Sequence, residues 1–206
     1  MYPGDYKLGE LDLQLLNGEW WGLFVINNSS YIKKVKLKID TLEPDIQYDW
    51  EYRISVLDSD NCVILFKGLD LSEREIIQFT ENQIIRNDEI FTFEFGPHHT
   101  FFNTKLKSVK RIGDIMNRDY SIFLNYNSKN NIYSQELFVF QCYEEELFIN
   151  LIWAGDLDSD GKTDFIMQIP SENNNEIGFN SGLFLSSYAG TEEMIKMVAS
   201  FVSSGC

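Results

Sequence analysis

Four aspartates in one short segment have the spacing of a calcium-binding loop. They are Asp156, Asp158, Asp160 and Asp164, at loop positions 1, 3, 5 and 9. Calcium takes about six to eight oxygen ligands, and alternate residues of a tightly coiled loop can direct their carboxylates at one centre. Gly161 stands at position 6, where the loop turns sharply, and Lys162 at position 7 would contribute its backbone carbonyl. The spacing predicts one calcium ion held by these five ligand residues.

The segment differs from a helix–loop–helix calcium site. Position 12, where a bidentate glutamate would close such a site, is Met167. The flanks 147–153 and 165–169 are short, apolar and rich in β-branched and aromatic residues, which predicts a strand on each side. Asp164 would then replace the glutamate, and the segment resembles the Asp-x-Asp-x-Asp-Gly-x-x-Asp loops of integrin-type and FG-GAP-type β repeats. The alternative is an acidic hairpin that binds no ion, but carboxylates converging without a cation would repel one another.

The composition limits the classes of protein to be considered. The 206 residues suffice for one domain with a substantial core or for two small domains. Seventeen basic and 32 acidic residues give a net charge of −15, which argues against a nucleic-acid or anionic-membrane partner. A basic protein partner, a cation or solubility would each fit this charge. No apolar run is long enough for a membrane-spanning helix, so no membrane insertion is expected. The oligomeric state stays open.

The chain start and the cysteines bear on location. The chain opens Met-Tyr-Pro-Gly-Asp, with no basic and apolar leader, which fits either a cytoplasmic protein or an exported protein without its leader. Three cysteines are present, none with metal or redox spacing. Cys206 follows a Ser-Ser-Gly tail and could bridge to Cys62 or Cys142 in an exported protein. The alternative is three free thiols.

Short alternating or apolar runs separated by turn residues predict a mainly β fold of antiparallel, sandwich-like sheets. Among them are 19–26, 31–39, 89–95, and the pair 120–126 and 135–140, which should form a hairpin around 127–131. One C-terminal helix is also expected. Thr191 is a suitable N-cap, and apolar residues recur at helical spacing from Met194 to Phe201. A polar stretch at 109–119 suggests an N-terminal β region, 1–112, and a C-terminal region, 113–206, unless the two are continuous.

The C-terminal third resembles a group of uncharacterised bacterial exported proteins. The similarity is carried by Trp-Ala-Gly-Asp-Leu-Asp-Ser-Asp-Gly-Lys-Thr-Asp at 153–164, by Gly-Leu-Phe-Leu-Ser-Ser at 182–187 and by the final Gly-Cys. The runs 18–25 and 65–69 are also similar to that group. Ser159 stands where glycine is usual, and Phe165 where leucine is usual, but neither change removes a ligand. The resemblance implies a periplasmic or secreted β-rich protein with a calcium loop, and it implies no particular activity.

No catalytic constellation is evident. The nucleophile-elbow, zinc-helix and phosphate-loop motifs do not occur. His98 and His99 are neighbours and would point in opposite directions on an extended segment. The acidic groups at 58–60 and 144–146 fit solvated turns. We therefore expect a calcium-stabilised binding protein acting outside the cytoplasm, such as an inhibitor or immunity protein for a basic partner. The alternative is a hydrolase of cell-wall or carbohydrate material, with tryptophans at 20, 21 and 50 available for sugar stacking.

Overall fold

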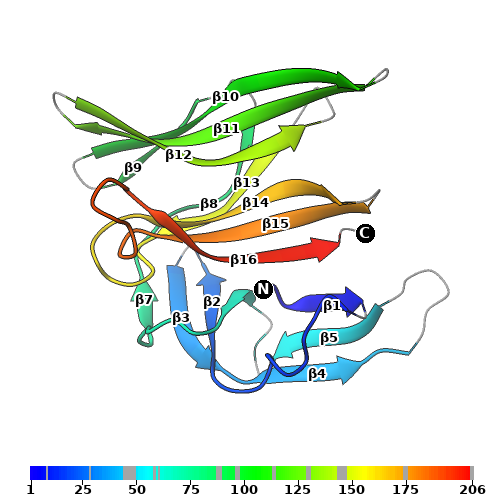
Figure 1. The fold of residues 1–206 in the computed structure, drawn as a ribbon. Helices are drawn as coiled ribbons and strands as arrows, with labels where there is room; N and C mark the ends of the chain where they lie inside the picture. Colours follow the sequence, from blue (N-terminus) through cyan, green and yellow to red (C-terminus); the bar gives the residue numbers. More distant parts are fainter. Residues whose placement is uncertain are drawn as a thin grey trace. The chain divides into compact units, whose positions relative to one another are not determined.

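The computed structural model covers residues 1–206 and contains two compact units, each with its own sheets (Figure 1). It describes the whole chain except residues 8, 28, 44–49, 58, 60, 87–89, 96–97, 113–114, 129–130, 143–147, 174–175 and 205–206, and describes some further strand residues by their backbone alone. The first unit comprises Met1–Gln78 with Val202–Ser204, and the second is built from Phe79–Phe201. The strands form four antiparallel sheets, which confirms the mainly β prediction.

The first unit holds a three-stranded and a four-stranded sheet, in the orders β1-β5-β4 and β6-β2-β3-β7. The strands are β1 Gly4–Lys7, β2 Trp20–Ile26, β3 Ser29–Val35, β4 Leu37–Thr41, β5 Trp50–Val56, β6 Cys62–Phe66 and β7 Arg74–Ile76. The single strand expected at 31–39 is in fact two strands, because the chain leaves one sheet at Lys36 and joins the other. β3 pairs with β2, whereas β4 pairs with β5.

The second unit contains a four-stranded sheet in the order β12-β11-β10-β9 and a five-stranded sheet in the order β16-β15-β14-β13-β8. The strands are β8 Gln78–Arg86, β9 Ile90–Phe95, β10 His98–Ile112, β11 Ile115–Ser128, β12 Asn131–Cys142, β13 Phe148–Gly155, β14 Asp164–Asn173, β15 Glu176–Leu185 and β16 Lys196–Ser204. The expected hairpin around 127–131 is present as β11–β12. The suggested division at 112/113 falls within the β10–β11 hairpin, and the compact units separate between Gln78 and Phe79.

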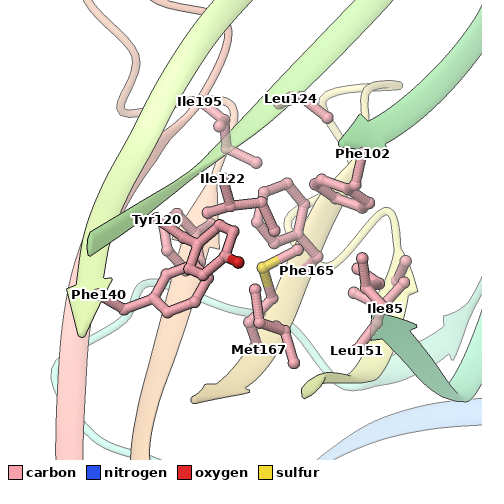
Figure 2. Packing of buried hydrophobic residues seen from close by; sticks show 13 residues of the cluster. Ile85, Phe102, Tyr120, Ile122, Leu124, Phe140, Leu151, Phe165, Met167 and Ile195 are labelled. Carbon is pink, nitrogen blue, oxygen red and sulfur yellow. The ribbon is translucent and has the colours of Figure 1, made fainter. Parts of the chain in front are cut away.

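The core of the second unit lies between its two sheets (Figure 2). Alternate residues of β11 point into it, and Tyr120, Ile122 and Leu124 are buried there. The rings of Phe102 and Phe165 meet edge to face at 5.1 Å and join the two sheets. This packing supports β13 and β14, the two strands that carry the aspartate loop.

The predicted C-terminal helix is wrong. Residues 191–193 form a turn, in which Glu193 donates its backbone N–H to the Gly190 carbonyl at 3.2 Å, and β16 follows from Lys196. Ile195 is buried in the core with its backbone held by the Gln135 side chain, so the chain is already fixed before β16. β15 offers β16 a strand edge to pair with, and a short isolated helix would gain less from its internal bonds. In the part of the chain that the structure describes, no helix is long and apolar enough to cross a membrane.

Candidate metal centre

The aspartate loop connects β13 to β14 in the five-stranded sheet. The strands pair up to Gly155 and Asp164, so the loop proper comprises residues 156–163. β13 carries a bulge between Leu151 and Trp153, just before the loop. Two loop residues adopt the left-handed conformation, Ser159 with φ 66° and Gly161 with φ 79°. These turns coil the loop tightly enough to bring residues several positions apart to one side.

Three of the predicted ligands converge. One carboxylate oxygen from each of Asp156, Asp158 and Asp164 lies within 4.8 Å of the other two. Asp156 Oδ2 accepts a hydrogen bond from the Gly161 N–H at 3.1 Å, whereas its Oδ1 is buried and has no hydrogen-bond partner among the described residues. A buried carboxylate oxygen without a donor costs free energy unless a cation or another donor reaches it. The donor set therefore fits a hard cation.

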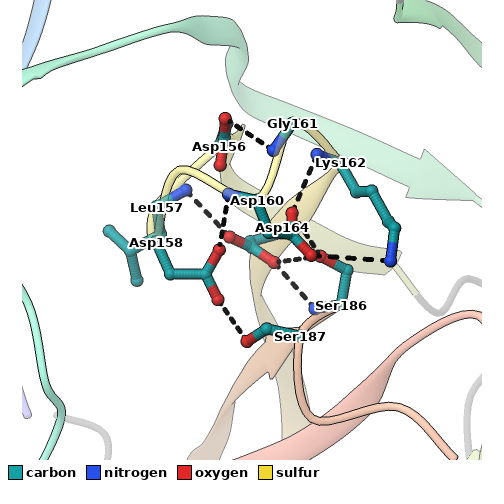
Figure 3. Close-up of polar contacts among 9 residues, drawn as sticks. All are labelled: Asp156, Leu157, Asp158, Asp160, Gly161, Lys162, Asp164, Ser186 and Ser187. Atoms are coloured by element: carbon teal, nitrogen blue, oxygen red, sulfur yellow. Dashed lines mark hydrogen bonds and ion pairs between the residues drawn. The ribbon is translucent and has the colours of Figure 1, made fainter.

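Asp164 is the buried anchor of the site. Its side chain is fully buried, Oδ2 accepts from the Leu157 N–H at 2.8 Å, and Oδ1 accepts from the Ser186 N–H at 2.8 Å (Figure 3). Its pKa is raised from 3.8 to about 7, mainly by burial and in part by the nearby charge of Asp158, against the lowering effect of the hydrogen bonds from Ser186 and Leu157. The residue thus joins the start of the loop to the end of β15, and its charged form needs compensation.

Asp156 and Asp158 are less buried than Asp164. Burial is the main cause that raises the pKa of Asp156, and the negative charges of Asp160 and Asp158 add to it. Asp158 Oδ1 accepts from the Asp160 N–H at 3.3 Å, and its Oδ2 accepts from the Ser187 hydroxyl. Mutual repulsion among these carboxylates is the electrostatic condition that a divalent cation relieves.

Asp160 and Lys162 are placed differently from the other predicted ligands. The Asp160 carboxylate accepts from the Ser186 hydroxyl at 3.0–3.1 Å and from the Lys162 N–H at 2.8 Å, and it does not belong to the three-aspartate cluster. The Lys162 ammonium lies 3.6 Å from the same carboxylate. To bind an ion together with the other three aspartates, the Asp160 carboxylate would have to move closer to them. Its role and that of the Lys162 carbonyl remain predictions.

Sequence reasoning did not assign a role to Ser186 and Ser187. Both follow β15 and donate their hydroxyl hydrogens to loop aspartates that precede them by 22 to 29 residues. The Leu-Phe-Leu-Ser-Ser run was visible as part of the resemblance, but its position beside the loop depends on the pairing of β14 with β15. A signal was therefore present in the sequence, without the geometry needed to interpret it.

The structure covers the other residues considered in the sequence only in part. The side chains of His98 and His99, the pair Asp58 and Asp60, and the acidic run 144–146 lie outside the described residues. Trp20 and Trp21 are buried, and the Trp20 indole donates to the Leu16 carbonyl, so these two rings are not available for sugar stacking. Trp50 is partly exposed.

One of the three cysteines can be described. Cys62 is a free thiol, and burial raises its pKa to about 12. The side chain of Cys142 and the whole of Cys206 lie outside the described residues. A bridge between those two stays a prediction.

In comparisons with known proteins, no family model, no curated protein and no solved structure matches the chain. The geometry of the aspartate loop is the feature of the described chain that bears on function. The possible metal ligands that converge in the loop are carboxylate oxygens. Such ligands suit calcium, magnesium or manganese better than softer metals. Calcium accepts irregular oxygen shells more readily than magnesium, which demands near-octahedral geometry.

Proposed function

We propose that residues 156–164 bind one calcium ion through Asp156, Asp158, Asp160 and Asp164 and the carbonyl of Lys162, with water completing the shell. The observation that carries this proposal is the convergence of the Asp156, Asp158 and Asp164 carboxylates. In addition, Asp156 Oδ1 is buried and has no hydrogen-bond partner among the described residues. Calcium supplies positive charge that offsets carboxylate repulsion.

The ion's role in this proposal is structural. The loop closes the hairpin between β13 and β14, and both strands contribute buried residues to the core, among them Leu151 and Phe165. An ion that binds only the folded loop stabilises the fold by mass action, by about 2.7 kcal/mol when its concentration is about 100 times Kd. Calcium should therefore raise the melting temperature.

Titration calorimetry with calcium chloride tests the site directly. We expect one binding event per chain, and no heat at millimolar calcium would contradict the proposal. Asp158→Ala should unfold more easily than the wild type in calcium. In excess chelator the difference in free energy of unfolding between the two proteins should become smaller. What remains should reflect only the hydrogen bonds that Asp158 accepts from the Ser187 hydroxyl and the Asp160 N–H. A variant that keeps wild-type stability in calcium but loses a measured activity would indicate a functional ion instead.

We further propose that the protein is a β-rich binding protein acting outside the cytoplasm, with a basic protein as its partner. The net charge of −15 supports a basic partner through electrostatic complementarity. Calcium loops of extracellular modules often bind in the range of about 10⁻⁴–10⁻³ M, which suits a calcium-rich compartment. Inhibition or immunity against a basic hydrolase or toxin is one form that this function could take.

Recovery of a partner from the envelope fraction of the native organism tests the binding function. A basic protein should be retained at low salt and released at high salt, because screening weakens exposed charge pairs. Turnover of a polysaccharide or peptide substrate by the purified protein would contradict the assignment to binding proteins.

A further inference from the structure

The chain between β15 and β16 is fixed at both of its ends. We call residues 186–195 the β15–β16 connection. At its start, Ser186 and Ser187 contact Asp158, Asp160 and Asp164 of the loop (Figure 3). Near its end, Met194 and Ile195 are bound by a side chain from the facing sheet. The middle, from Ser187 to Glu193, is mostly exposed.

The contacts at Ser186 depend on the arrangement of the aspartates. Its hydroxyl lies 3.0 Å and 3.1 Å from the two oxygens of Asp160 and 3.1 Å from Asp164 Oδ1. A hydroxyl has one hydrogen, so it can satisfy these three acceptors only in part. Any ion that draws Asp160 toward Asp156 and Asp158 changes which acceptor the hydroxyl serves. The position of Ser186 is thereby sensitive to the state of the loop.

The other end of the connection is held by Gln135 on β12. Its Oε1 accepts from the Met194 N–H at 2.6 Å and from the Ile195 N–H at 3.1 Å, while its Nε2 donates to the Ile195 carbonyl at 2.7 Å. Ile195 itself is 1% exposed within the core between the sheets. One amide side chain thus satisfies three backbone groups that lie outside any strand ladder. Its removal would leave these groups without their partner and loosen the connection.

We propose that Ser186 and Gln135 are positioning residues of the calcium site, coupled through the β15–β16 connection. Among the described residues, the Gln135 side chain donates and accepts hydrogen bonds only with Met194 and Ile195 and not with the loop, yet it fixes the segment that presents Ser186 to Asp160 and Asp164. Ion binding and attachment of the connection then stabilise each other. Because such coupling is reciprocal, loosening the connection weakens calcium binding by the same factor by which calcium tightens the connection. This inference rests on the proposed calcium site.

The test compares two neighbouring positions on β12. Gln135→Ala removes the clamp without changing any charge. Ser134→Ala is the matched control, since Ser134 is exposed, adjacent and on the opposite face of the strand. Calorimetric titration with calcium chloride should show about fivefold or more weaker binding for Gln135→Ala and no change for Ser134→Ala. A folded Gln135→Ala variant with wild-type calcium affinity would overturn the coupling.

Hydrogen exchange of the wild-type protein provides a second measurement that does not depend on the variant folding. Amides of residues 187–195 should exchange about fivefold or more slowly in calcium than in chelator, while those of β2, a strand of the first unit, serve as the internal reference. Equal exchange of the connection in both conditions would also overturn the inference. If the wild type shows no calcium binding at all, the proposed site fails first, and that result is distinct from calcium binding without an effect on the connection.

Discussion

Ser159 occupies a backbone conformation that suits glycine. Its φ of 66° lies in the left-handed region, where a residue other than glycine costs about 1–3 kcal/mol. Glycine removes this cost but loses about 0.5–1 kcal/mol through the greater freedom of the unfolded chain. Ser159→Gly should therefore raise the free energy of unfolding by about 0.5–1 kcal/mol in urea titrations made in chelator.

The reverse change at the neighbouring turn is the control. Gly161 has φ 79°, and a Cβ added there would meet nothing within 4 Å. Gly161→Ala should therefore lower the free energy of unfolding by about 1–2 kcal/mol through backbone strain alone. A destabilised Ser159→Gly would show that the serine makes a compensating contact and would contradict the argument from strain.

Asp164 predicts a particular dependence of stability on pH. Its pKa is raised from 3.8 to about 7 in the fold, so between these values the folded state binds more protons than the unfolded state. The stability that protonated Asp164 adds to the fold is complete below about pH 4. It is lost as the pH rises to about 7. In chelator, unfolding titrations should show this decline in the wild type. Asp164→Asn should be less stable but should show a weaker decline, and an equal slope in both proteins would contradict the assigned pKa.

At the scale of residues, the sequence identified the loop but not its surroundings. The spacing of Asp156, Asp158 and Asp164 was sufficient, because a coiled loop brings nearby residues together by local geometry alone. The placement of Asp160 was not predictable in this way. It depends on Ser186, which β15 brings beside the loop through pairing with β14. A contact between residues far apart in the sequence cannot be predicted from the spacing of residues within one short segment.

The elements were predicted best where a short, mostly apolar run is bounded by turn residues. The run 89–95 corresponds to β9, and the run 120–126 lies within β11. The polar stretch 109–119 was not recognised as strand, although β10 and β11 pair through it. Lys105, Lys107 and Lys110 are all exposed, so this part of β10 lacks an alternating apolar pattern. At 191–201, methionine and phenylalanine spacing suggested a helix. The chain instead pairs with the edge of β15 as strand β16, and the Gln135 side chain fixes the residues just before it.

Gly182 on β15 provides a prediction at the scale of the sheet. A Cβ at this position would lie 2.8 Å from Phe184 Cε2 and 3.2 Å from Met197 Sδ. Phe184 is buried and stacked on Phe165 at 4.8 Å, so its ring has little room to move. Gly182→Ala should therefore lower the free energy of unfolding by about 1–3 kcal/mol, as overpacking does.

Shortening one neighbour distinguishes the two contacts. Met197 is half exposed and flexible, so Met197→Ala in the Gly182→Ala background should recover little of the lost stability. Full recovery would show that the crowding comes from Met197 on β16 and would contradict the role assigned to the Phe184 ring. Thermal and urea unfolding of the single and double variants measure this directly.

The charge of the whole molecule is uneven as well as large. Five of the seventeen basic residues lie between positions 105 and 118, on β10 and β11. They are Lys105, Lys107, Lys110, Arg111 and Arg118. Lys107 pairs with Glu136 at 2.7 Å, whereas the exposed Lys110 ammonium lies 3.9 Å from the Asp119 carboxylate, which is a long and therefore weak ion pair. A basic partner should therefore bind away from this hairpin, toward surfaces where acidic residues are in excess.

The net charge of −15 also predicts how salt and calcium act on stability, and allows the two to be separated. Repulsion among like charges destabilises the compact state, and raising sodium chloride from about 0.1 M to about 0.5 M shortens the range of that repulsion. In chelator, this change should raise the free energy of unfolding in urea without a defined saturation point. Calcium at millimolar concentration and fixed ionic strength should add a saturable increase, because the proposed site would take up one ion where Asp156, Asp158 and Asp164 converge. Asp158→Ala should keep the response to sodium chloride and lose the saturable increase. If calcium acts on that variant as it does on the wild type, the ion is screening the whole molecule and is not bound at the loop.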